Sequence, residues 1–350
     1  MSAQRAVFLF VITIVFATVL VYPPLRFWSL IFPDRPAPVA WAAVLFITPF
    51  IVRFMHGYRS NVVTRALSAI VLSWVGISFL GLSILLPLEL FLQLTLTSPT
   101  KAGFAALALL SVLSLYSLYN AHPLHVKTLV INNGRGAAGS RIAQVSDLHL
   151  GSRQPGLLAK TVVKLQALQP DYVALTGDIV DMYGITEQDL RPLESLEMPV
   201  LFCIGNHERY VDLVDICTRL RNCGVHVLRN QTKEIGNLQF IGIDDAESKS
   251  QVATEITKLQ PSQDNYRILL YHRPDGGEAA AAWGVDLMLT GHTHRGQLIP
   301  FNLLVKRVFP RLYRDYKIGD MTLYVSPGTG TWGPVMRLGS KCEITLIELM

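Results

Sequence analysis

Charged residues are scarce in this sequence, and cysteine is nearly absent. Only 16% of the 350 residues are Asp, Glu, Lys or Arg, whereas 50% are hydrophobic. The four cysteines form no C-x-x-C pair, so their spacing predicts neither a zinc knuckle nor a disulfide framework. They are Cys203, Cys217, Cys223 and Cys342. This sparse use of cysteine favours a reducing compartment.

The sequence also lacks the broad basic surface of a nucleic-acid-binding protein. Its formal net charge is only +5, and basic and apolar residues interleave in one place, residues 301–317. The basic residues there are Lys306, Arg307, Arg311, Arg314 and Lys317. This segment is either a flap that touches an anionic membrane surface or a lipid substrate, or an ordinary active-site loop. We expect no nucleic-acid partner.

The apolar residues are concentrated in residues 1–120, which we predict to be a transmembrane region of about four helices. Four runs are long enough to span a bilayer, namely 6–22, 37–52, 66–95 and 102–119. The third run exceeds one simple span, so we expect it to end as an interfacial segment. No A-x-A cleavage site follows the first run, which favours a membrane helix over a cleaved signal peptide.

The Lys and Arg residues of the short loops predict the orientation of these helices. With four spans, Arg5, Arg53, Arg59, Arg65 and Lys127 lie on one side, and Arg26, Arg35 and Lys101 lie on the other. This distribution favours a multi-pass protein of the cell inner membrane with residues 121–350 in the cytoplasm. A three-span count would reverse the orientation. Charged residues are scarce within the spans, which indicates an anchor rather than a transporter.

Residues 121–350 have an ordinary globular composition, and strand-like segments alternate with helix-like ones. This alternation predicts an α/β domain. Five short apolar segments, 142–145, 172–175, 200–204, 268–270 and 287–289, read as strands that end before clusters of Asp, Asn or His. Because ligands of open α/β sheets bind beyond the carboxyl ends of strands, we expect these clusters to converge on one site.

Histidine is the residue type that identifies the chemistry. Five of the nine histidines follow the predicted strands: His149, His207, His272, His292 and His294. One histidine is usually a surface or hydrogen-bonded core residue, but five beside Asp, Asn or Gly predict a metal site. Residues two apart, such as Asp147 and His149, would face the same side of an extended chain. The same argument applies to His292 and His294.

Carboxylate and imidazole ligands without thiolate suit Mn, Fe or Zn and argue against a structural zinc site. Seven candidate ligands are too many for one tetrahedral ion. Asp178 follows a glycine, which allows close approach, and its two oxygens could bridge two ions. Two ions about 3.5–4 Å apart suit an in-line displacement, so the residues predict phosphoryl chemistry.

Five motifs, in this order, resemble those of the calcineurin-like metallophosphoesterases. They are D-x-H (147–149), G-D (177–178), G-N-H-E (205–208), His272 and G-H-T-H (291–294). The resemblance covers about residues 125–350, and the ordered set is far more specific than any single motif. Residues 328–339 (GTGTWGPVMRLG) and GHTHRGQ resemble the membrane-associated bacterial branch, which includes UDP-2,3-diacylglucosamine hydrolases of lipid A synthesis and relatives with undefined substrates.

The resemblance implies a four-layer α/β/β/α sandwich over residues 121–350, preceded by the transmembrane helices of residues 1–120. It further implies two divalent metal ions, with Mn²⁺ expected and Fe or Zn as alternatives. One ion would be held by Asp147, His149, His294 and the bridging Asp178, and the other by Asp178, Asn206, His272 and His292.

The resemblance also implies catalytic roles. A metal-bridging hydroxide would attack phosphorus, while His207 protonates the leaving group or stabilises its charge. Asp181 matches the carboxylate that orients this histidine, although it could instead cap a turn or helix. Two residues depart from the family pattern: Glu208 replaces a more usual Asp, and Arg295 stands where this branch often has Gly. Arg295 either binds a substrate phosphate or is a solvated loop residue.

Together, these features predict a membrane-anchored dinuclear-metal phosphohydrolase. Its substrate would be a phosphorylated small molecule or lipid, and the anchor makes a lipid-linked or nucleotide-linked substrate attractive. The alternative is a non-catalytic membrane scaffold that uses the same fold. A scaffold is expected to have lost ligands, yet all seven are present. A nuclease is possible on this fold, but no DNA-binding appendage is evident.

Overall fold

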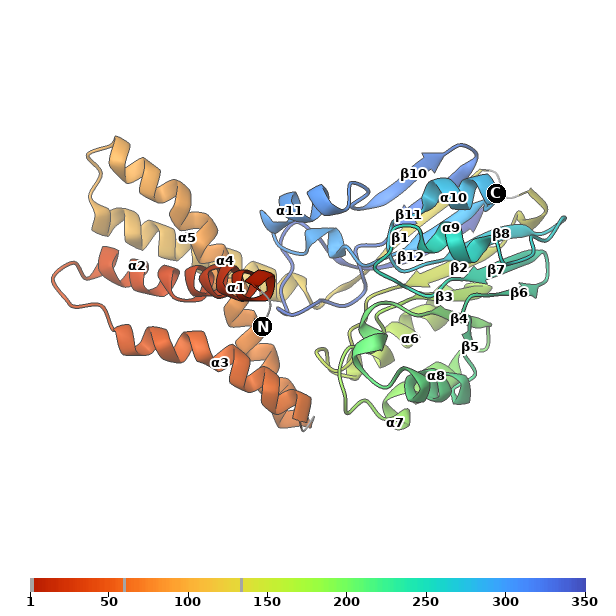
Figure 1. Cartoon of the computed structure of the whole chain (residues 1–350), viewed down its shortest axis with the longest axis horizontal. Coiled ribbons are helices and arrows are strands. Elements are labelled where there is room, and N and C mark those ends of the chain that lie inside the picture. Colours follow the sequence, from red (N-terminus) through yellow and green to blue (C-terminus); the bar gives the residue numbers. More distant parts are fainter. Residues whose placement is uncertain (1–2, 59–60, 133–134) are drawn as a thin grey trace. The chain divides into compact units, whose positions relative to one another are not determined.

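The computed structural model describes residues 3–58, 61–132 and 135–350, and the chain divides into two compact units (Figure 1). The helical unit comprises the residues up to Tyr119 together with Gly333–Leu338, and the α/β unit comprises Asn120–Trp332 and Gly339–Met350. With a single domain boundary at residue 120, Gly333–Leu338 would belong to the α/β unit instead of the helical unit. Arg59, which the orientation argument uses, lies outside the described residues.

The helical unit contains five helices: α1 (Ala3–Leu20), α2 (Tyr22–Ile31), α3 (Val39–Tyr58), α4 (Val62–Leu94) and α5 (Pro99–Asn120). Within the described residues, four stretches are long and apolar enough to cross a membrane, namely Val11–Ile31, Val39–Gly57, Val62–Leu94 and Pro99–Asn120. The predicted four apolar helices are therefore confirmed. The first stretch continues beyond residue 22 because Pro23 and Pro24 lie in the first turn of α2, where a missing N–H breaks no helical hydrogen bond.

Helix α4 has 33 residues, a length of roughly 50 Å at 1.5 Å per residue, which exceeds the hydrocarbon thickness of a bilayer. Near its end the Glu89 carboxylate accepts hydrogen bonds from Arg26 Nε at 2.5 Å and from Tyr22 Oη at 3.2 Å. This ion pair offsets the cost of a carboxylate in an apolar helix.

Residues 333–338 pack closely within the helical unit. A Cβ atom on Gly76 of α4 would lie 2.7 Å from Met336 Sδ and 3.0 Å from Pro334 Cβ, so only glycine fits there without a shift. The Arg337 N–H donates to the Ser117 carbonyl oxygen at 2.8 Å.

Two six-stranded sheets form the centre of the α/β unit. The first has the order β1 (Leu124–Ile131), β12 (Cys342–Leu349), β2 (Arg141–Val145), β3 (Tyr172–Thr176), β4 (Val200–Cys203) and β5 (His226–Val227). The second has the order β10 (Arg314–Ile318), β11 (Met321–Val325), β9 (Leu287–Thr290), β8 (Tyr266–Leu270), β7 (Leu238–Gly242) and β6 (Gln231–Ile235).

Helices cover the outer faces of both sheets (Figure 1). The α-helices of this unit are α6 (Gly156–Leu168), α7 (Glu187–Leu190), α8 (Leu213–Asn222), α9 (Gln251–Ile256), α10 (Gly277–Trp283) and α11 (Phe301–Val308). Short 3₁₀ segments occur at Arg135–Ala137, Arg191–Ser195, His207–Tyr210 and His294–Gly296.

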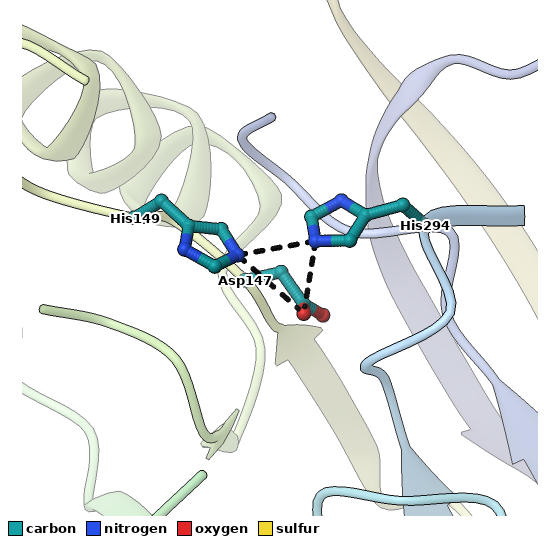
Figure 2. Close-up of side chains that lie close together, drawn as sticks. All are labelled: Asp147, His149 and His294. Carbon is teal, nitrogen blue, oxygen red and sulfur yellow. Dashed lines mark hydrogen bonds and ion pairs between the residues drawn. The ribbon is translucent and has the colours of Figure 1, made fainter. Parts of the chain in front are cut away.

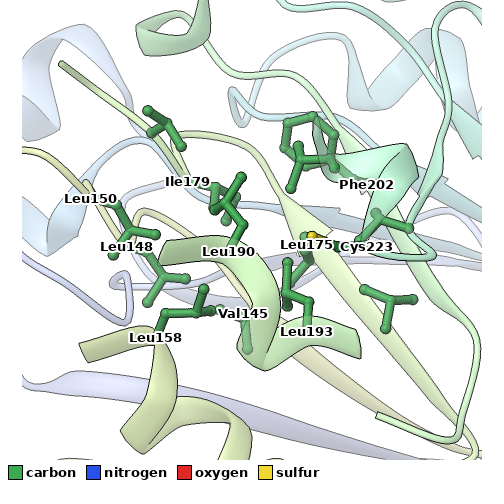
Figure 3. Close-up of a cluster of buried hydrophobic side chains, with 14 of the residues drawn as sticks. Val145, Leu148, Leu150, Leu158, Leu175, Ile179, Leu190, Leu193, Phe202 and Cys223 are labelled. Carbon is green, nitrogen blue, oxygen red and sulfur yellow. The ribbon is translucent and has the colours of Figure 1, made fainter. Parts of the chain in front are cut away.

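Three apolar clusters hold the layers together. Buried residues of both sheets, such as Leu201 and Phe240, form the cluster between them. A second cluster joins the first sheet to α6 and α8, with Val145, Leu158 and Phe202 among its members (Figure 3). A third joins the second sheet to α9 and α10. This arrangement confirms the predicted four-layer α/β/β/α sandwich.

Strand direction determines where the polar loops emerge. Strands β2, β3 and β4 are mutually parallel, and so are β7, β8 and β9. The carboxyl ends within each set therefore lie along the same edge of its sheet, which is where ligands bind in α/β folds.

Candidate metal centre

The first cluster of candidate ligands consists of Asp147 and His149, which follow β2, and His294, which follows β9 (Figure 2). His294 Nε2 lies 3.4 Å from Asp147 Oδ1, and His149 Nε2 lies 3.9 Å from the same oxygen. The two imidazole Nε2 atoms are 3.1 Å apart. All three side chains are nearly or fully buried. One cation could be bound by these three converging ligand atoms.

The second cluster consists of Asp178 after β3, His272 after β8 and His292 after β9. His272 Nε2 lies 3.0 Å from Asp178 Oδ2 and 3.2 Å from His292 Nδ1. Asp178 Oδ2 is also 3.8 Å from His149 Nε2 of the first cluster. The Asp178 carboxylate therefore lies where a ligand shared by two ions would have to be.

Asn206 provides a test of whether these residues fit metal ions. Its Oδ1 atom is buried and has no hydrogen-bond partner in the described part of the chain. A buried amide oxygen without a partner costs free energy, which coordination to a cation would offset. The donor set of carboxylate, amide and imidazole groups suits borderline divalent ions. The residues present thus fit the two ions that the sequence predicts.

The backbone of this site is unusual. Five of the candidate ligands have positive φ: Asp147 (55°), His149 (53°), Asp178 (54°), His292 (69°) and His294 (48°). For a non-glycine residue this conformation costs about 1–2 kcal/mol. The expectation that these loops are extended is therefore wrong. His292 and His294 reach different clusters because left-handed residues turn the chain between them.

Hydrogen bonds fix the orientation of the ligand side chains. The His272 Nδ1 atom is 2.8 Å from the Thr176 carbonyl oxygen, which can only accept, so Nδ1 carries the proton and Nε2 is free to face the ion. Asp178 Oδ1 accepts from the His207 N–H at 2.8 Å. Asp147 Oδ2 accepts from Ser146 Oγ at 2.6 Å. These hydrogen bonds therefore orient the ligand atoms towards the two clusters.

Glu208 contacts the loops that carry the ligands. Its carboxylate is fully buried and accepts four backbone N–H groups: Asp178 (3.0 Å), Ile179 (2.6 Å), Val180 (3.1 Å) and Gly205 (2.7 Å). Burial and the charge of Asp178 raise the pKa of Glu208 to about 7, although the backbone N–H donors act in the opposite direction. Glu208 therefore joins the loop after β3 to the loop after β4.

His207 and Asp181 lie beside the first cluster. His149, Asp181 and His207 each contribute an atom to a third convergent group. Asp181 Oδ2 lies 3.3 Å from His149 Nδ1, and its Oδ1 accepts from the Ser152 N–H. The hydrogen bond that orients Asp181 thus comes from Ser152, and the buried Nδ1 atoms of both His149 and His207 have no hydrogen-bond partner within the described ranges. Whether Asp181 orients His207 stays a prediction.

The charges of the cluster favour a bound cation. Burial lowers the pKa of His272, but the charge of Asp178, the hydrogen bond to it and the charge of Asp147 raise it to about 10. Burial lowers the pKa of His207 to about 4, with Asp178 opposing and His149 reinforcing the shift. A positive charge is therefore stabilised between Asp147 and Asp178, where the ions are expected.

Arg295 stacks on Tyr313 with its guanidinium carbon 4.5 Å from the ring centroid. Arg314 and Lys127 lie 5.5 and 5.1 Å from the same ring. Among the described residues none of these three cations forms an ion pair. The buried Glu343 carboxylate accepts from Tyr313 Oη at 3.0 Å. Burial lowers the pKa of Lys127, and the negative charges of Glu343 and Asp315 oppose this shift. Arg295 directly follows the candidate ligand His294, and whether it binds a substrate phosphate stays a prediction.

The sequence pattern predicted seven candidate ligands but gave no role in the site to Glu208, Asp245, Lys127 or Tyr313. Asp245 follows β7 at the same sheet edge, is buried, and accepts from Arg273 Nε at 2.8 Å. Asp245 closely follows the apolar segment 239–243, a signal that could have identified it. Lys127 and Tyr313 are far apart in sequence, so no local pattern could have joined them.

The first testable consequence concerns the glycine before His292. A Cβ atom on Gly291 would lie 2.0 Å from Ser146 Oγ and 2.3 Å from Asp147 Oδ2. We expect Gly291→Ala to displace Asp147 and to weaken metal binding by at least about tenfold, the scale of losses when support of a metal ligand is removed. Equilibrium Mn²⁺ binding to the purified chain measures the effect.

Gly156→Ala is the matched control, because nothing lies within 4 Å of its Cβ position at the start of α6. If Gly291→Ala bound Mn²⁺ as tightly as Gly156→Ala, the close contact between Gly291 and Asp147 would not position a ligand.

Comparison with known proteins agrees with this geometry. The profile of the family described as "Calcineurin-like phosphoesterase" matches residues 140–296. An uncharacterized metallophosphoesterase of Aquifex aeolicus is 33% identical over 222 residues, which cover 60% of this chain and 84% of that protein. The chain therefore belongs to the calcineurin-like metallophosphoesterase family.

Two longer relatives match a similar share of this chain. An uncharacterized metallophosphoesterase of Campylobacter jejuni is 30% identical over 222 residues, which cover 60% of this chain and 59% of the relative. A protein of Bos taurus named "Transmembrane protein with metallophosphoesterase domain" is 31% identical over 233 residues, which cover 60% of this chain and 52% of the relative. This chain thus matches little more than half the length of these two relatives.

Proposed function

We propose that this protein is a membrane-anchored dinuclear-metal phosphohydrolase that cleaves a phosphoester or pyrophosphate bond. The observation that carries the proposal is the convergence of two Asp/His clusters on the shared carboxylate of Asp178. Divalent ions bound there would supply Lewis acidity and a water that ionises near neutral pH. Mn²⁺ is the expected metal, and Fe or Zn would also suit these ligands.

Each candidate residue has a part in this proposal. Asp147, His149, His294 and Asp178 would hold one ion, and Asp178, Asn206, His272 and His292 the other. His207, whose Nε2 lies 4.0 Å from Asp178 Oδ2, is placed to protonate the leaving oxygen or to stabilise its charge by hydrogen bonding. Asp181 Oδ2 lies 3.3 Å from His149 Nδ1, and the Asp181 carboxylate is within reach of His207.

The apolar helices suggest where the substrate is found. We infer a location in the cell inner membrane, with the α/β unit in the cytoplasm, as the Lys and Arg distribution favours. A lipid-linked or nucleotide-linked phosphate would then be within reach of the enzyme. A non-catalytic scaffold is the second candidate, but the complete ligand set and its hydrogen-bonded support favour hydrolysis.

A substrate panel tests the proposal. The full chain in detergent would be assayed with Mn²⁺ on p-nitrophenyl phosphate, bis-p-nitrophenyl phosphate and a UDP-linked acyl sugar. We expect metal-dependent turnover of at least one, and the preferred compound would define the bond that is cleaved. A chain that binds two metal ions but hydrolyses none of the three would favour the scaffold.

Arg295 gives a prediction about substrate choice. If the three cations around Tyr313 bind a second anionic group of the substrate, Arg295→Gln should lower kcat/KM for the UDP-linked sugar by about 10–100-fold, the worth of one charge-assisted hydrogen bond. The value for p-nitrophenyl phosphate, which has no second anionic group, should fall far less. Arg221→Gln on the exposed side of α8 is the control. Equal losses on both substrates would contradict an anion site at Arg295.

A further inference from the structure

Helix α11 presents an apolar surface that no described residue covers. None of its eight residues is buried. Leu303, Leu304 and Val308 are 63%, 59% and 62% exposed, and Ile299 just before the helix is 48% exposed. Single exposed apolar side chains are common on proteins, but four within ten residues form a patch of the kind that marks an interaction site.

The same surface is basic. Lys306 and Arg307 lie in the last turn of α11, are exposed, and form no ion pair with any described residue. Arg311, by contrast, is paired with Glu278, so it is not part of the available charge. No Asp or Glu occurs from Leu287 to Arg314. The patch therefore combines apolar side chains with uncompensated positive charge.

The inner side of α11 is fixed to the loop of the metal centre. A Cβ atom on Gly296 would lie 2.2 Å from Asn302 Cα, which shows how closely the helix approaches that loop. The residue after the helix, Phe309, packs its ring edge-on against His292 with centroids 4.9 Å apart. Thr293 Oγ1 donates to the Leu312 carbonyl oxygen at 2.7 Å. Whatever binds the outer side of α11 is thus held beside the candidate ligands.

We propose that the outer surface of α11, defined by Ile299, Leu303, Leu304, Lys306, Arg307 and Val308, binds the surface of an anionic lipid bilayer. The apolar side chains would enter the acyl boundary while Lys306 and Arg307 contact headgroup phosphates. Two features select this partner: the complementary charge, and the four stretches of the same chain that are long and apolar enough to cross a membrane. Eight residues alone would bind weakly, but attachment to membrane helices makes the contact intramolecular and raises its effective concentration.

This proposal rests on the proposed hydrolase and narrows its substrate class. A bilayer contact adjacent to His292 favours an amphiphilic phosphate compound, one whose apolar part remains in the membrane while its phosphate reaches the metal centre. A soluble substrate would gain nothing from an apolar helix at this position.

The test uses the full chain in lipid nanodiscs, with and without phosphatidylglycerol. The four native cysteines are all buried, so a cysteine introduced by Leu304→Cys can be labelled with an environment-sensitive fluorophore. Val214→Cys is the matched control, because Val214 is an apolar residue of α8 that is 75% exposed. Doxyl-labelled lipids in the disc then quench only those labels that enter the bilayer.

We expect quenching at position 304 to exceed that at position 214 by about threefold or more in anionic discs. The added changes Lys306→Glu and Arg307→Glu should reduce it to the control value, because they reverse the charge that headgroups attract. Equal quenching at both positions would overturn the proposal. A label at position 304 whose fluorescence emission is blue-shifted but is not quenched by doxyl lipids would also overturn the proposal. In that case another protein surface, such as a second copy of this chain, would cover the helix.

Hydrolysis of all three compounds of the substrate panel is measured on the same discs, which separates the two proposals. Strong quenching without Mn²⁺-dependent hydrolysis would contradict the hydrolase while supporting the membrane surface. Hydrolysis with no difference between positions 304 and 214 would support the hydrolase and contradict the membrane surface.

Discussion

Asp178→Asn is expected to lower the turnover of p-nitrophenyl phosphate by on the order of a thousandfold or more. The side chain is almost fully buried, its Oδ2 lies 3.0 Å from His272 Nε2 and 3.8 Å from His149 Nε2, and it is the group nearest to both clusters. Asparagine has one acceptor oxygen and no charge, so it cannot balance two cations or bridge them. Steady-state kinetics and metal analysis of the same preparation measure both effects.

The matched control for this change is Asp212→Asn. Asp212 caps α8 by accepting the N–H groups of Val214 and Asp215, and asparagine caps helices about as well as aspartate. This control therefore removes one carboxylate from the same unit with little effect on folding. If Asp178→Asn retained two metal ions and turnover within tenfold of the control, Asp178 would not be the shared ligand.

Replacement of Glu208 is expected to have the largest effect on stability. Glu208→Ala removes the acceptor of four buried N–H groups and leaves a cavity, which together should cost about 3–5 kcal/mol. At roughly 2–4 °C per kcal/mol for a unit of this size, the melting temperature should fall by about 10 °C. The melting temperature of Glu208→Gln should lie between those of the unchanged protein and Glu208→Ala, because the glutamine NH₂ group faces donors and only its oxygen accepts.

Glu197→Ala, on the exposed segment before β4, is the control for these variants. The measurement is thermal unfolding of the full chain in detergent, followed by Mn²⁺ binding below the transition. A melting temperature of Glu208→Ala within about 2 °C of the control would mean that the four hydrogen bonds are replaced by water, and that Glu208 does not hold the loops.

The fold could be predicted from the sequence where short apolar segments are directly followed by clusters of Asp, Asn or His. Strands and helices alternate in the α/β unit as expected, and the short strands end where Asp and His begin. The candidate ligands were identifiable because loops at the ends of parallel strands must meet. Their conformation was not predictable, because five of them adopt positive φ. Asp and His adopt positive φ more often than most residues, but it is still uncommon for them.

Long-range packing accounts for the remaining differences. Nothing local indicates that Gly333–Leu338 packs with Gly76 of the helical unit. Glu208 could be recognised in the sequence as a departure from a motif. The four N–H groups that donate to its carboxylate, however, lie in its own turn and in a loop about thirty residues earlier in the chain, which no local pattern connects. Residues 301–317 were left open between a flap and a loop, and the structure shows a helix followed by a strand.

The central claim is that this chain binds two divalent ions and uses them to hydrolyse phosphate compounds. Mn²⁺ titration of the metal-free full chain tests it most directly, with bound metal and turnover of the substrate panel measured at each point. We predict saturation at two ions per chain and turnover that appears as the second ion binds. Saturation without turnover of any substrate would contradict the hydrolase, and a chain that binds no ion would contradict the metal centre itself.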